Sequence, residues 1–329
     1  GGGRGSGRGR KDMKKKPEKR PQLSQLVDMY DPAAVLAEAK RIFTDRYGAA
    51  PFEPVEKAFA DVLRLYSGRY PGYCACNTRY HDIMHITDSF LAMARLLDGY
   101  NSVHAALFPA RLASVGLIAA LLHDAGFIQR RGDKKGTGAK YTVTHVARSV
   151  AFIRSYLPKN GFGREDVRAA SNALWCTDLS TRLSGIGFRG QREKVLGFML
   201  GSADLLGQMA SRCYLERLAL LYEEFREAGV PGFTSELDLL RKTTGFYRLM
   251  DERLSVSLGG VRRYLRAHFR ARYRVDRDMY RESMDRQMDF LRSVVLAHPR
   301  SYSGYLRRAI FRETGPAPRG SAVVRRGNI

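Results

Sequence analysis

The sequence predicts an all-α fold, with a single helical domain over residues 23–300 between basic termini. Apolar residues recur at helical spacing along most of the 329-residue chain. No stretch of useful length alternates apolar and polar residues as a strand would, and no internal repeat is visible. A chain of this length can bury a sizeable core in one large domain or two smaller ones, and we expect one.

Start and stop signals divide this domain into helices. Asp31 followed by Pro32 is a typical helix start, with Asp31 as the N-cap, and predicts a helix over 32–47. A second helix is expected over 54–66, and a third over 81–97 after a loop. Further helices are expected over 115–122, 144–157, 164–176, 190–212, 213–228, 234–256, 261–273 and 277–296.

The net charge of +23 is concentrated at the two ends of the chain. Residues 1–20 carry nine Lys and Arg against two acids, and residues 261–329 carry seventeen against six. The Gly/Arg/Lys-rich stretch 1–22 cannot form a core, so we expect a disordered basic arm there and a loose basic tail over 301–329. Such ends can contact nucleic acid non-specifically, or they can simply be solvated; the Arg-Gly run has no interleaved aromatic residues for base stacking.

Cysteine content and hydropathy set expectations about the compartment. Four cysteines in a chain this long do not suggest a disulfide framework, so a reducing cytoplasm is expected. The first residues lack the apolar segment of a secretory signal. We expect no membrane span, because no apolar run approaches the roughly 18–20 residues that one needs.

Residues with metal-binding chemistry lie inside or beside apolar segments. His123 and Asp124 end an apolar run, where a histidine and a charged carboxylate are unfavourable unless a bound cation compensates them. His81 and His85 are four residues apart and are expected on one helix face, and Asp204 lies in another apolar stretch. Two imidazoles and two carboxylates suit Mn, Fe, Mg, Ni or Zn.

In order and spacing, these residues resemble the HD superfamily of metal-dependent phosphohydrolases, in the branch similar to cyclic nucleotide phosphodiesterases. The resemblance implies that His85, His123, Asp124 and Asp204 hold one or two divalent ions. It implies that His81 is the general acid and that Asp124 also acts in catalysis by bridging two ions. The chain departs from that branch in having Asp82 where an Asn is usual and no second histidine after the His-Asp pair.

Other polar residues lie close to this motif in the sequence. His145 resembles a histidine that many bacterial HD proteins carry after the His-Asp pair, which implies a second metal or a contact with the substrate phosphate. Lys134, Lys135 and Lys140 follow the pair in a Gly/Lys-rich loop and could cover phosphates as a flexible lid, or be solvated. Arg148 shares a helix face with His145 and could clamp a phosphate.

The resemblance implies a phosphohydrolase that acts on a phosphomonoester or phosphodiester, with a nucleotide or cyclic nucleotide as the favoured substrate, and that uses a metal-activated water. One alternative is a non-catalytic protein that binds nucleic acid or a partner and keeps the metal as a structural element. Another is an HD-type di-iron oxygenase, which would need ligands beyond four, such as His145. A homodimer is also considered, with residues 254–273 as a candidate face.

Overall fold

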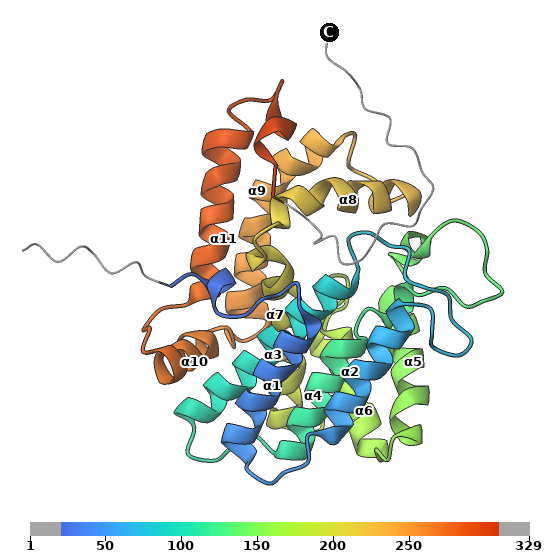
Figure 1. The fold of residues 1–329 in the computed structure, drawn as a ribbon, viewed down its shortest axis with the longest axis vertical. Coiled ribbons are helices and arrows are strands. Elements are labelled where there is room, and N and C mark those ends of the chain that lie inside the picture. The colour runs from blue at the N-terminus through green and yellow to red at the C-terminus, as the bar shows by residue number, and fades with distance from the viewer. Residues whose placement is uncertain (1–20, 309–329) are drawn as a thin grey trace, which may run out of the picture.

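The computed structural model describes residues 21–308 and confirms the all-α prediction (Figure 1). Within these residues the chain forms eleven α-helices and no strand, apart from two isolated β-bridges. Residues 1–20 and 309–329, which hold most of the predicted arm and tail, lie outside the described part. The helices are α1 (Pro32–Tyr47), α2 (Glu53–Tyr66), α3 (Ile83–Val103), α4 (Ala110–Leu122), α5 (His145–Lys159), α6 (Arg164–Trp175), α7 (Gln191–Ala210), α8 (Tyr214–Glu227), α9 (Glu236–Glu252), α10 (Arg263–Tyr273) and α11 (Met279–Phe290).

Capping side chains explain where two of the helices begin. Asp31 accepts a hydrogen bond from the backbone N–H of Ala33, and α1 has the predicted bounds. Asp82 likewise accepts from the N–H groups of Met84 and His85, so α3 begins at Ile83. The prediction of one helix through residues 81 and 85 was therefore wrong at its start, because the N-cap lies between the two histidines.

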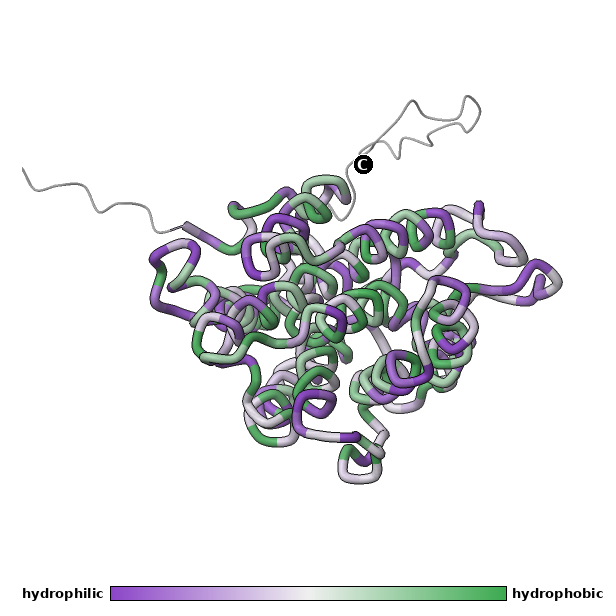
Figure 2. The backbone as a smooth tube through the Cα atoms, turned by 90° about the horizontal axis from the view of Figure 1, so that it is seen from below, coloured by the Kyte–Doolittle hydropathy of each residue, from purple (hydrophilic) through white to green (hydrophobic). Residues whose placement is uncertain are grey.

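The core is built around α3, α4 and α7, which contact one another along their lengths. The helices α1 and α10 pack on α3, whereas α2 and α6 pack on α4 (Figure 1). The most hydrophobic segments lie inside this arrangement and the hydrophilic loops project from it (Figure 2). Three buried helices thus meet at the centre of the molecule, and the candidate site is built from them.

The stretch Ala110–Phe127, which contains α4, is apolar for a reason that the sequence alone does not give. Its 18 residues have a mean hydropathy of 1.3, so by length and composition they would suffice to cross a membrane. In the structure 83% of this stretch is buried among the other helices. The expectation that no apolar run reaches such a length was wrong, and the burial of α4 accounts for its composition.

Packing near the C-terminal end bears on two further expectations. Residues 301–308 were assigned to a loose tail, but Tyr302 bonds to Glu236 of α9 and Arg308 bonds to the Arg212 carbonyl. The homodimer with 254–273 as its face stays a prediction; Val256 of this segment is 70% exposed, but most of its other apolar side chains are buried in the chain's own core. These include Leu254, Leu258, Val261, Tyr264, Leu265 and Phe269.

A buried network around Asp98 joins α1, α3 and α10. The Asp98 side chain is inaccessible to solvent and accepts hydrogen bonds from Arg46 (2.6 Å), Arg272 (2.8 Å) and His268 Nδ1 (2.6 Å). Although burial opposes ionisation, these partners hold the pKa of Asp98 below its ordinary value. Burial outweighs the hydrogen bond to Asp98 and, with the nearby Arg95 and Arg272, lowers the pKa of His268 to about 4. His268 is therefore neutral at pH 7.

The pKa of His268 predicts a loss of stability in mild acid. A histidine in the unfolded chain has a pKa of about 6.5, so between pH 6.5 and 4 the unfolded state binds a proton that folded His268 does not. Between pH 7 and 5 the free energy of unfolding should fall by about 2 kcal/mol more in the wild type than in His268→Asn. Urea unfolding of both proteins at the two pH values measures this difference, and equal pH dependence would contradict it.

Candidate metal centre

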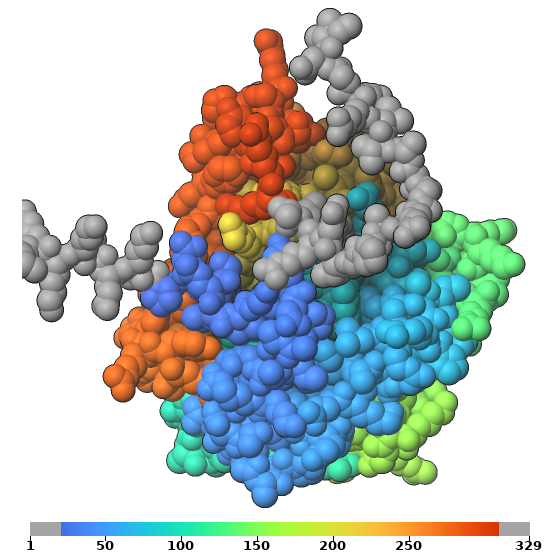
Figure 3. All heavy atoms as spheres, in the orientation of Figure 1, coloured from blue at the N-terminus to red at the C-terminus, as the bar shows by residue number. Residues whose placement is uncertain are grey.

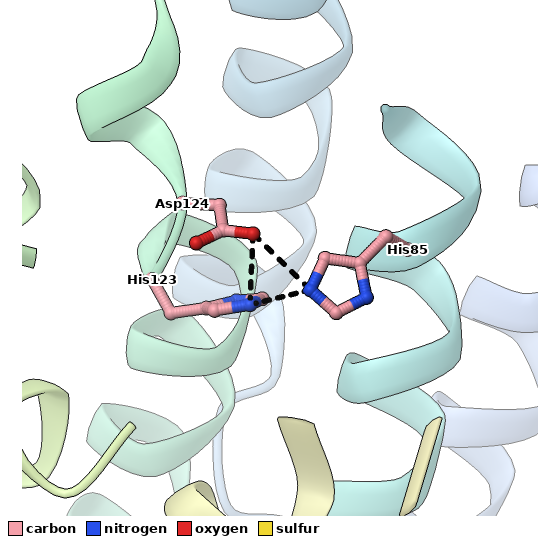
Figure 4. Close-up of side chains that lie close together, drawn as sticks. All are labelled: His85, His123 and Asp124. Carbon is pink, nitrogen blue, oxygen red and sulfur yellow. Dashed lines mark hydrogen bonds and ion pairs between the residues drawn. The ribbon is translucent and has the colours of Figure 1, made fainter. Parts of the chain in front are cut away.

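Four chemistry-bearing side chains converge where the three central helices meet. His85 lies in the first turn of α3, and His123 and Asp124 directly follow the last residue of α4 (Figure 4). Asp204 lies within α7 and completes the group. All four residues are buried, with exposures of at most 9%. The structure therefore brings together the four residues that the sequence selects as metal ligands.

The ligand atoms of these residues are separated by distances that suit a single ion. His85 Nε2 lies 3.1 Å from Asp124 Oδ2, from Asp204 Oδ1 and from His123 Nε2. His123 Nε2 lies 3.4 Å from the same Asp124 oxygen and 3.6 Å from the same Asp204 oxygen. Donor atoms about 2.1 Å from one ion lie about 3.0–3.5 Å from one another, so the atoms of His85, His123 and Asp124 fit around a divalent cation, and Asp204 Oδ1 lies beside the two imidazoles.

The hydrogen bonding of the ligands is consistent with such an ion. His123 Nδ1 is 2.8 Å from the Ala120 carbonyl oxygen, to which it donates, so Nε2 is the ring nitrogen that faces the cluster. Asp124 Oδ2 has no hydrogen-bond partner among the described residues, although it is buried. A buried carboxylate oxygen without a donor is unfavourable, and a cation between it and the imidazoles would compensate it.

The pKa values of the cluster show the effect of packing two imidazoles against two carboxylates. Burial lowers the pKa of His85, but Asp124 and Asp204 outweigh it and raise the pKa to about 9. The same carboxylates raise the pKa of His123 well above its ordinary value. Although burial opposes ionisation of the two carboxyls, the imidazoles hold their pKa values well below the usual range. The site thus favours positive charge between the carboxylates, from protons or from a metal ion.

The second oxygen of Asp124 faces away from this cluster and toward His145. Asp124 Oδ1 lies 3.6 Å from His145 Nε2, and His145 Nδ1 donates to the Thr142 carbonyl at 2.6 Å. Burial lowers the pKa of His145, which favours the neutral imidazole that binds metals. Asp124 is therefore placed to bridge two positions, one among the four ligands and one beside His145.

Close backbone packing fixes the segment that carries Asp124 to the start of α5. A Cβ atom on Gly126 would lie 1.9 Å from the carbonyl oxygen of His145, so only glycine fits there. The Gly126 N–H donates to Ser149 Oγ at 2.8 Å. Arg148 donates to the carbonyls of Gly126 and Ile128 at 2.6 and 3.1 Å. These contacts fix the position of Asp124 relative to His145.

His81 lies outside α3, beside the cluster and against a carboxylate that the sequence did not single out. His81 Nδ1 is 2.6 Å from Oε2 of Glu224, a buried residue of α8. The ring of His81 stacks on that of Phe127, with centroids 4.2 Å apart. No sequence signal marks Glu224, which is one of several acids in its helical segment. Asp82, beside His81 in the sequence, caps α3 and pairs with Arg217 at 2.8 Å.

The basic residues after the His-Asp pair are arranged differently from the predicted flexible phosphate lid. Lys140 Nζ is bonded to Asp133 Oδ1 and to the Lys135 carbonyl, each at 2.5 Å. The Gln129 side chain donates to three backbone carbonyls of the same loop. Lys134 and Lys135 are exposed, and their phosphate contacts stay predictions. The loop is thus fastened by internal bonds, and the predicted phosphate clamp Arg148 is engaged in holding the segment behind Asp124.

The site was also compared with what is known of other proteins. Neither the models of known protein families, nor the curated proteins, nor the solved structures include a significant match to this chain. The function proposed below therefore depends on the geometry of the site and on the resemblance of its motif to the HD superfamily.

Proposed function

We propose that the protein is a metal-dependent phosphohydrolase of the HD type that acts on a phosphomonoester or phosphodiester, with nucleotides or cyclic nucleotides favoured. The observation that carries the proposal is the convergence of ligand atoms of His85, His123 and Asp124, 3.1–3.4 Å apart, from α3 and the end of α4, with Asp204 Oδ1 of α7 3.1 and 3.6 Å from the two imidazoles. An ion held there would neutralise charge on phosphoryl oxygens and lower the pKa of a bound water. The orientation of Asp124 toward both the cluster and His145 supports room for a second ion.

His81 and Glu224 could supply a proton to a substrate, which a purely structural metal site does not need. Hydrolysis of a phosphate ester requires a proton for the departing oxygen, and an imidazole beside the cluster can deliver it near neutral pH. The bond from Nδ1 to Glu224 fixes the ring and leaves Nε2 as the atom that exchanges the proton. We therefore assign His81 as the general acid and Glu224 as its positioning residue.

Replacing Glu224 with Gln should lower kcat by about 10–100-fold, because the His81 ring loses the carboxylate that orients it. The metal content should not change, since Glu224 is not among the ligands. A matched control is Glu223→Gln, which removes a neighbouring acid paired with Arg79. Equal kcat values for the two variants would contradict the assignment.

The proposal is tested by elemental analysis of the purified protein, followed by an activity screen in the same preparation. Nitrophenyl phosphate, bis-nitrophenyl phosphate and cyclic nucleotides are offered with added Mn, Mg, Fe or Ni. We expect close to one or two equivalents of metal per chain and hydrolysis of at least one substrate. Stoichiometric metal without hydrolysis would favour a structural site, whereas metal-free protein that no ion activates would overturn the proposal.

A further inference from the structure

A second cavity lies on another face of α3, away from the metal ligands. It has a volume of about 350 Å³ and is enclosed by residues 23–30, α3, the end of α7 and Tyr280 of α11. From α3 it is lined by Met84, Asp88 and Arg95, and none of the four candidate metal ligands lines it. In Figure 3 the yellow part of the chain is visible between the blue N-terminal segment and the orange helix α11, where this region reaches the surface. The volume is in the range of small-molecule sites.

Arg95, one of four charged residues that line this cavity, is almost completely buried and incompletely bonded. Arg95 is 2% exposed and donates one hydrogen bond, from Nη1 to the Tyr280 hydroxyl at 3.0 Å. Its Nε and Nη2 atoms have no hydrogen-bond partner within residues 21–308. The guanidinium also lies 5.8 Å from the ring centroid of Phe269 and 5.7 Å from that of Tyr280. Ring faces compensate its charge only in part.

Asp28 and Asp88 also line this cavity, but the Nε and Nη2 atoms of Arg95 bond to neither of these acids. Glu38, a nearby acid of α1, is bonded to Arg41 and to the Tyr273 hydroxyl. Asp88 lies seven residues earlier on α3, which is about 10 Å along the helix. Because a buried charge without a counter-ion is strongly unfavourable, the cavity is suited to a ligand that brings an anion to Arg95.

The residues that line the walls and the entrance of the cavity indicate what the remainder of the ligand would be like. Met29, Tyr30, Met84 and Tyr280 give it an apolar and aromatic lining. It adjoins a second hollow of about 310 Å³, and the two share Ser24, Gln25 and Arg212 as lining residues. The second hollow also contains Arg286 and Arg308. Three arginines at the entrance attract anions from solution and repel cations.

We propose that this cavity binds a small organic acid, in which a carboxylate or phosphoryl group contacts Arg95 and an apolar or aromatic body fills the space between the N-terminal segment and α11. The two acid groups share the same chemistry, a planar or tetrahedral oxyanion that accepts two hydrogen bonds from one guanidinium. The ligand is held apart from the metal centre. The inference goes beyond the proposed hydrolysis and does not depend on it.

Calorimetric titration of the full-length protein with benzoate, phenylphosphonate and neutral benzyl alcohol tests the proposal. Asp124→Asn is titrated in parallel, so that an anion bound at the metal centre is recognised by its loss in that variant. We expect at least one of the two acids to bind both proteins equally, and benzyl alcohol to bind at least tenfold more weakly. The acid that binds more tightly identifies a carboxylate or a phosphoryl ligand. Binding of neither acid, or binding that Asp124→Asn abolishes, would overturn the proposal.

Two variants assign the binding to Arg95. Arg95→Met keeps the length and apolar contacts of the side chain and should weaken binding of the acid at least tenfold. If that variant does not fold, Val27→Glu decides the question, because Val27 is a half-buried wall residue and a glutamate there would fill the cavity and pair with Arg95. We expect Val27→Glu to lose acid binding while it keeps the circular dichroism spectrum of the wild type. Unchanged affinity in either folded variant would refute the site.

Discussion

Replacing Asp124 with Asn is expected to abolish binding of the proposed metal and to lower the proposed phosphoester hydrolysis by at least about 100-fold. Asp124 is the residue whose two carboxylate oxygens face different partners, one the His85 and His123 imidazoles and the other His145. An amide is a weaker ligand than a carboxylate and brings no negative charge to balance a cation. Elemental analysis and turnover with the best substrate from the screen measure the two effects.

Asp289→Asn is a suitable control for this variant, because Asp289 is 78% exposed on α11 and pairs only loosely with Arg292, at 4.0 Å. It should keep the metal content and the turnover of the wild type. His145→Ala separates the two positions that Asp124 joins: the ion among the four ligands should remain while activity falls. Wild-type metal content and turnover in Asp124→Asn would show that the cluster is not the reaction centre.

Replacing Asp98 with Asn is expected to destabilise the protein by about 3–5 kcal/mol, because it leaves the partly buried Arg46 without its counter-ion and leaves Arg272 with Asp45 alone. Arg272 is only 9% exposed and Arg46 is 26% exposed in their side chains, so water does little to screen them. The stabilisation from Asp98 requires an ionised carboxyl. It is therefore complete above pH of about 4, the value of an unfolded aspartate, and is lost as the pH falls.

Denaturant unfolding at pH 7 measures the effect of Asp98→Asn against an exposed ion pair of the same type. Asp276 pairs with Arg266 at 2.8 Å, with both side chains more than half exposed, so Asp276→Asn should change stability by at most about 1 kcal/mol. A loss below 1 kcal/mol for Asp98→Asn would mean that its arginine partners find other acceptors.

Local signals made most of the fold predictable. The helix α1 has its predicted bounds because one short segment, Asp31-Pro32, supplies both the cap and the first helical residue. At α9 and α11 the predictions ran past the α-helical ends, because π-helical turns at Arg253–Ser257 and Leu291–Val295 continue the chain in the same direction. A hydrophobic period does not distinguish the two kinds of turn.

The candidate site was predictable where its residues stand in apolar sequence and not where tertiary packing creates it. His123, Asp124 and Asp204 are conspicuous because a polar residue in an apolar helix needs a compensating partner. Glu224 could not be recognised in the same way, because acids are common on the exposed face of an amphipathic helix. Its importance comes from the folded structure, in which it is buried against His81, a residue far away in the sequence. Arg95 was missed for the same reason. Whether its guanidinium has a hydrogen-bond partner depends on where the neighbouring acids lie in the folded chain.

The separation of the four ligands along the chain has a consequence for how the protein would depend on its environment. A chain in which α3, α4 and α7 are apart cannot hold an ion at four points, so the ion binds the native state alone. Free metal would then act as a stabiliser by mass action, and each tenfold rise in its concentration above the dissociation constant would add about 1.4 kcal/mol to the free energy of unfolding. The melting temperature of this protein would thereby report the metal supply around it.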